Sequence, residues 1–111
     1  MQKRLELISQ ILDEKKAENI QLVDMSSNPD YPVKAVVIAT TLTARHGEAL
    51  IDELKTRLKP LGEEFLGVET ADEWSVADLG DIFIHLMSES LRAKYDLETL
   101  LAELAKPTKS L

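Results

Sequence analysis

A nearly uncharged stretch at residues 33–40 constrains this fold more than any other feature. It reads Val-Lys-Ala-Val-Val-Ile-Ala-Thr, and Lys34 is its one charged residue. β-Branched side chains favour strands, and a strand that is apolar on both faces is typical of the interior of a sheet. The stretch therefore predicts a strand buried on both faces, near the centre of the sheet.

Two amphipathic helices are predicted, one before this strand in the sequence and one after it. In residues 2–17, Leu5, Ile8 and Leu12 form one helical stripe. After the strand, the hydroxyl residues at 40–43 can cap a second helix, and residues 59–62 (Lys-Pro-Leu-Gly) should end it. The apolar residues of this second helix lie three and four apart, at Leu50, Ile51, Leu54, Leu58 and Leu61.

The other elements are shorter. Residues 20–24 and 64–68 read as strands, and residues 26–32 and 69–73 as loops. Two further strands, at 74–79 and 82–87, should form a hairpin, because glycine accepts the positive φ that a tight Gly80-Asp81 turn needs.

Ser88 can cap a helical turn that runs through Lys94. A last helix carries Leu97, Leu100, Leu101 and Leu104.

The element order is helix, two strands, helix, three strands, helix. A helix between the second and third strands suggests a crossover, and therefore parallel as well as antiparallel pairs. We predict a single α/β domain over residues 1–105, with a mixed five-stranded sheet flanked by helices, and a short polar tail at 106–111.

Composition narrows the possible functions. The formal net charge of −7 disfavours direct nucleic-acid readout, which depends on Lys and Arg, and favours a basic protein partner. Solubility alone would also explain the charge. The chain has no cysteine, no apolar run near about 18 residues and no signal-peptide pattern, so we expect a cytoplasmic protein without a membrane span.

Few residues suggest catalysis or the binding of a metal or an anion. His46 and His85 have no local metal-ligand spacing, and no cofactor is expected. Asp78 and Asp81 could act as paired carboxylates, as turn residues or as partner contacts. The hydroxyls at 40–43 could hold an anion, although helix capping is the simpler interpretation.

Trp74, Arg92 and Tyr95 belong to the residue types that dominate interface energetics. Trp74 could be a binding anchor or a core residue.

Most of the chain resembles the Iojap-like family, the bacterial ribosomal silencing factors. The resemblance rests on motifs that occur in the family's order over roughly residues 5–104. They are Asp24, Ile38-Ala-Thr40, Arg45-His46, the hairpin with Trp74, Asp78, Gly80-Asp81 and His85, and a closing Arg92, Tyr95 and Leu97-Glu98. The chain departs from the family pattern at residues 41–44 and at Leu101.

The resemblance implies a translation repressor that is not an enzyme. It would bind the large ribosomal subunit through ribosomal protein fourteen and sterically block joining of the small subunit. The fold would be nucleotidyltransferase-like without the active site, and the free protein could be a homodimer. The partner-binding residues would be Trp74, Asp78, Leu79, Gly80, Asp81, His85, Arg92 and Tyr95.

Two other functions remain open. One is a nucleotidyltransferase-like, nucleotide-binding enzyme that uses Asp78 and Asp81. The other is a generic acidic adaptor for a different basic protein.

Overall fold

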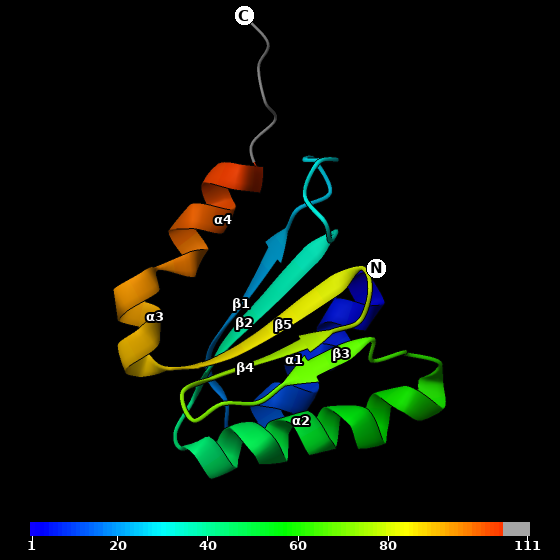
Figure 1. The fold of residues 1–111 in the computed structure, drawn as a ribbon. Coiled ribbons are helices and arrows are strands. Elements are labelled where there is room, and N and C mark those ends of the chain that lie inside the picture. The colour runs from blue at the N-terminus through cyan, green and yellow to red at the C-terminus, as the bar shows by residue number, and fades with distance from the viewer. Residues whose placement is uncertain (106–111) are drawn as a thin grey trace, which may run out of the picture.

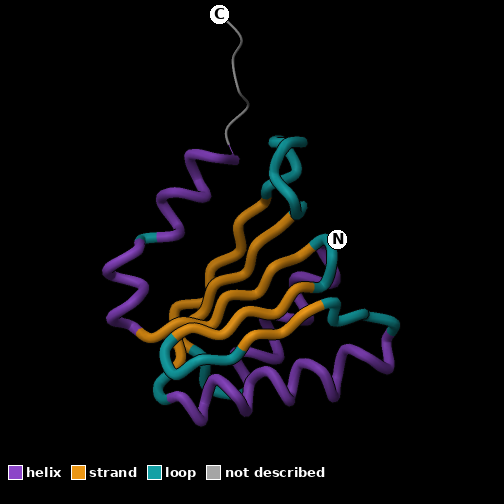
Figure 2. The backbone as a smooth tube through the Cα atoms, viewed as in Figure 1, coloured by secondary structure: helices purple, strands orange, loops and turns teal. Residues whose placement is uncertain are grey.

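The structure, a computed structural model, describes residues 1–105, which form a five-stranded sheet and four α-helices (Figures 1 and 2). In sheet order the strands are β1 (Glu18–Asp24), β2 (Ala35–Thr41), β5 (Ile82–Ser88), β4 (Trp74–Asp78) and β3 (Gly67–Glu69). β2 and β5 are parallel and the other neighbours are antiparallel, so the predicted mixed sheet is confirmed.

β2 is buried along its whole length, as predicted for residues 33–40. It pairs on one side with β1 and on the other with β5. Its polar end is buried too, since Thr40 is 5% and Thr41 is 7% exposed. The strand begins at Ala35, two residues later than predicted, and one more bond continues its pairing with β1: the Met25 amide donates to the Lys34 carbonyl at 2.8 Å.

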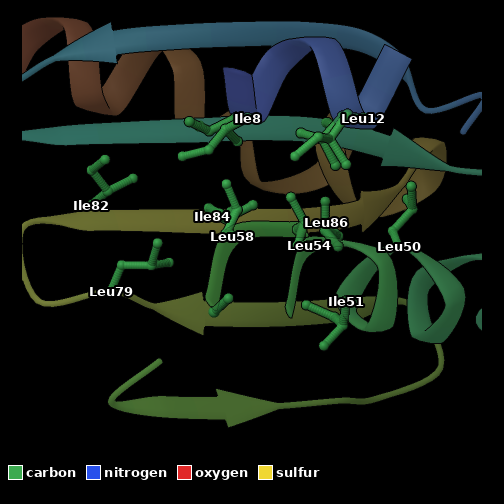
Figure 3. Packing of buried hydrophobic residues seen from close by; sticks show 14 of the residues in the cluster. Ile8, Leu12, Leu50, Ile51, Leu54, Leu58, Leu79, Ile82, Ile84 and Leu86 are labelled. Carbon is green, nitrogen blue, oxygen red and sulfur yellow. The ribbon is translucent and has the colours of Figure 1, made fainter. Parts of the chain in front are cut away.

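The helices α1 (Gln2–Glu14) and α2 (Ala44–Leu58) cover one face of the sheet (Figure 1). Their buried stripes meet the same side of β2, β5 and β4, as Figure 3 shows. The shared core includes Ile8, Leu12, Leu50, Leu54, Leu58, Val37, Ala77, Ile84 and Leu86. The stripe predicted for the first helix is therefore confirmed, and so is that of the second helix from Leu50 to Leu58. Leu61 is a correction: it lies beyond the end of α2, in the 3-10 turn Lys59–Leu61, and is 67% exposed.

Boundaries before β1 and at β3 also differ from the sequence prediction. The first helix ends at Glu14, and Lys16 adopts a left-handed φ of 71°, so β1 begins at Glu18. The strand expected at residues 64–68 is only Gly67–Glu69, the three residues that pair with β4; the 3-10 turn Lys59–Leu61 before it ends at Gly62, which has a φ of 96°.

The helices α3 (Glu89–Tyr95) and α4 (Leu97–Ala105) lie on the other face, toward β1 and β2 (Figure 1). Ser88 caps α3 by accepting from the Leu91 amide, as predicted. Within residues 1–105, no helix covers the outer half of this face, over β4 and β3. This uncovered half of the sheet sets the position of the candidate site.

The hairpin between β4 and β5 turns through Gly80 and Asp81, as predicted. The Leu79 amide donates to the Ile82 carbonyl at 2.9 Å, and the Asp78 carboxylate accepts from the Gly80 amide at 2.8 Å. Gly80 has a φ of 94°, and a Cβ there would lie 3.3 Å from Leu66 Cδ1. The turn therefore requires glycine for both conformation and space.

We expect Gly80→Ala to lower the free energy of unfolding by about 1–2 kcal/mol, because an L side chain is strained at this φ. Gly67→Ala is the control, since Gly67 lies in a strand with nothing within 4 Å of its added Cβ. Urea unfolding of both variants tests the point. Equal stability of the two variants would contradict it.

Candidate partner-binding surface

Alternate residues of β4 and β5 point to the uncovered half of the sheet. Trp74, Val76 and Asp78 are half-buried, while the residues between them are buried against the helices. The register pairs Val76 with His85 and Asp78 with Phe83, so these side chains share a face. This confirms the predicted common strand face.

An aromatic cluster lies at the centre of this face. The Trp74 indole Nε1 donates to His85 Nδ1 at 3.0 Å, and their ring centroids are 5.9 Å apart. Tyr95, at the end of α3, lies 5.5 Å from Trp74, and Phe83 meets His85 edge-on at 6.3 Å. We call Trp74, Val76, Phe83, His85 and Tyr95 the aromatic face.

The aromatic face is mostly apolar at its centre and charged at its edges. Burial lowers the pKa of His85 below its usual 6.5, which favours the neutral ring. The register places Glu69 of β3 beside Val76 of β4. Asp78, two residues further along β4, is paired with Phe83 on the same face. Lys94 lies over the Tyr95 ring, 5.4 Å from its centroid. Tyr95 itself is 49% exposed, so an aromatic ring is available to a partner.

Four predicted site residues lie away from this face, and three of them belong to the hairpin turn. Leu79 is 6% exposed and belongs to the core under α1 and α2. Gly80 forms the turn. Asp81 binds Arg4 of α1, which approaches it at 2.6 Å and also binds Glu63 at 2.7 Å. The hydrogen bonds from Arg4 lower the pKa of Asp81, so this carboxylate is already committed to an internal ion pair.

Arg92 is buried rather than exposed, although it is close to Tyr95 in sequence. Its side chain donates to Thr40 Oγ1 at 2.9 Å, to the Asn19 carbonyl and to the Glu98 carboxylate. These bonds join α3 and α4 to β1 and β2. Arg92 therefore holds the helices that border the aromatic face and does not itself lie on it.

Phe83 and Val76 belong to the face but were not among the predicted site residues. Their signal was the two-residue periodicity that they share with His85 and Trp74. That signal gives the face of a strand, but it cannot tell whether a helix will cover it.

His46 and Thr43, the other residues considered in the sequence for a metal or an anion, have structural roles. His46 accepts from the Leu42 amide at 3.0 Å through Nδ1, so its Nε2 donates to the Lys15 carbonyl at 2.7 Å. It thereby links the start of α2 to the end of α1. Thr43 caps α2 by accepting from the His46 amide.

In residues 1–105, no group of three or more His, Asp or Glu side chains could hold a metal ion. No helix there is long and apolar enough to cross a membrane.

The fold defines a class of protein: a small α/β domain with a mixed five-stranded sheet, which here presents a partly exposed aromatic cluster beside α3. Two solved structures are similar over the whole length. One, from Chromobacterium violaceum, is 27% identical with a TM-score of 0.82, covering 99% of this chain and 89% of the other. The second, from Bacillus halodurans, is 27% identical with a TM-score of 0.75, and both chains are covered completely.

The family follows from sequence comparison. A family model described as RsfS, ribosomal silencing factor during starvation, matches residues 1–110. A ribosomal silencing factor of Haemophilus influenzae is 34% identical over 101 residues, which is 88% of this chain and 97% of the relative. That of Chromobacterium violaceum is 29% identical over 96 residues, 85% and 78% respectively. The chain belongs to the RsfS family, and the resemblance inferred from its motifs is confirmed.

We expect Arg92→Met to lower the free energy of unfolding by about 2–3 kcal/mol, because it leaves buried oxygen atoms and a carboxylate without their donor. The value lies at the lower end for a broken buried pair, since the Glu98 side chain is 30% exposed. Lys94→Met, on the exposed side of the same helix, should change stability by less than about 1 kcal/mol. Similar losses in both variants would contradict this role of Arg92.

Proposed function

We propose that this protein represses translation by binding the large ribosomal subunit through ribosomal protein fourteen, so that the small subunit cannot join. Membership of a family described as ribosomal silencing factors supports the ribosome as partner. The observation that carries the proposal is the aromatic face, which is partly exposed beside α3 and contains the chain's single tryptophan.

The chemistry of the aromatic face suits this partner. Trp and Tyr supply large, rigid contact area, and such residues dominate binding energy when a partner excludes water around them. Glu69 and Asp78 at the edge, with the net charge of −7, complement a basic ribosomal protein. We place Trp74, Asp78, His85 and Tyr95 in the contact.

The other predicted residues support the contact indirectly. Gly80 and Leu79 shape the hairpin, Asp81 fastens it to α1, and Arg92 holds α3 beside Trp74. The proposed mechanism is steric, so it needs neither cofactor nor catalytic group. We further propose that the protein acts in the cytoplasm and that the free protein is a homodimer, both on the strength of the family resemblance.

The direct test mixes purified subunits with saturating protein and measures joined ribosomes by gradient sedimentation. We expect the protein to sediment with large subunits and to lower the yield of joined ribosomes. An unchanged yield would overturn the proposal. Binding without a loss of joining would favour a generic adaptor, and nucleotide turnover with magnesium would favour the nucleotidyltransferase-like alternative.

Trp74→Ala should weaken binding by about 2 kcal/mol or more, roughly thirtyfold, because truncation of an anchor removes its desolvated contact. Trp74 is half-buried, so the variant should still unfold cooperatively. Leu61→Ala is the control, since Leu61 is 67% exposed and lies outside the aromatic face. Wild-type binding by a folded Trp74→Ala protein would rule out the anchor role.

Affinity should fall as salt rises, because charges at the rim act over about 8 Å at physiological ionic strength. Glu69→Gln should reduce this salt dependence. Asp52→Asn, which removes an exposed charge from α2, should not. Equal affinity for ribosomal protein fourteen from low to high salt would show that charge complementarity does not drive the contact.

A further inference from the structure

The hydrogen bond between Trp74 and His85 fixes the state of the imidazole ring. An indole N–H can only donate, so Nδ1 of His85 must accept and carry no proton. The ring is then neutral, with its hydrogen on Nε2. A second proton would place two donors 3.0 Å apart, and the bond could not persist.

The indole has two ring neighbours, and the loss of its hydrogen bond to one of them would change how it is held. The distance between ring centroids is 5.9 Å to His85 and 5.5 Å to Tyr95. The register places Trp74 opposite Met87, whose side chain is fully buried below it. Of these neighbours, only His85 is bonded to the polar atom of the indole.

The surroundings of His85 offer little compensation for a positive charge. β2 presents Ile38 and β4 presents Val76 in register with it, and Phe83 is its neighbour along β5. α3 contributes Tyr95, with Lys94 over the Tyr95 ring. The nearest acidic groups by register are Glu69, two strands away on β3, and Asp78 of β4, which is paired with Phe83 and not with His85 itself. Burial among these groups lowers the pKa of His85, in agreement with this arrangement.

We infer that His85 is a proton-sensitive positioning residue: its neutral ring holds the Trp74 indole in the orientation that a partner binds, and its protonated ring releases the indole. The inference rests on the proposed function for its effect on the ribosome, and on the hydrogen bond alone for its effect on Trp74. Partner binding through the aromatic face then weakens as the pH falls through the pKa of His85, below 6.5.

The free protein gives the first test, because its single tryptophan has one indole N–H resonance. We expect this resonance to shift with one transition below pH 6.5 as the hydrogen bond is lost. His85→Gln keeps an acceptor for the indole but does not titrate, so its resonance should stay constant through that range. His46→Gln removes the other histidine and should titrate like the wild type. A constant wild-type resonance, or a transition that persists in His85→Gln, would overturn the inference.

The second test measures binding to purified ribosomal protein fourteen at about pH 7.5 and about pH 5.5. The wild type should lose affinity at the lower pH, by less than about tenfold because the pKa of His85 lies below 6.5, and His85→Gln should lose much less. His85→Leu, which has no acceptor, should bind weakly at both values while remaining folded. An equal pH effect in the wild type and His85→Gln would overturn the inference. Absence of any binding at about pH 7.5 would instead overturn the proposed function, and the indole titration would still decide the role of His85.

Discussion

The parallel pairing of β2 with β5 is the constraint on which the rest of this structure depends. The ladder runs from Ala35 beside Ile82 to Thr41 beside Ser88, and β2 is buried on both faces. Parallel strands cannot be joined by a tight turn, so the chain must cross over one face before it returns. That crossover contains α2, which together with α1 buries the apolar side of the sheet.

The same pairing determines which part of the sheet remains uncovered. β5 uses its second edge for β4, which is joined to it by the Gly80 turn, and the short β3 ends the sheet. α3 begins directly after β5 and is held toward β1 and β2 by Arg92, through the Asn19 carbonyl and Thr40. The aromatic face lies beside these two helices, and Tyr95 at the end of α3 is part of it. In a family of ribosomal silencing factors, such a face is where we place the contact with the ribosome.

Much of this arrangement could be predicted from local patterns. The spacing of Leu50, Leu54 and Leu58, the β-branched run of β2 and the Gly80 turn each depend on neighbouring residues, and each prediction is confirmed. The residues of the candidate site were harder to predict from the sequence, because their positions depend on contacts with residues that are distant in the chain. Arg92 belongs to a type usually found at surfaces, and its burial depends on Asn19 and Thr40, 73 and 52 residues away. Asp81 is separated by 77 residues from Arg4, which binds it.

We propose that the sheet face with Trp74, and not the face covered by α1 and α2, binds the large subunit. The chain has no cysteine, so a single thiol can report on each face. Glu69→Cys places the thiol at the edge of the aromatic face, and Asp52→Cys places it on the exposed side of α2. The two variants are matched in charge, because each substitution removes one carboxylate. With saturating large subunits, the account predicts that maleimide labelling is strongly slowed at position 69 and unchanged at position 52. Protection at position 52 with free labelling at position 69 would contradict it.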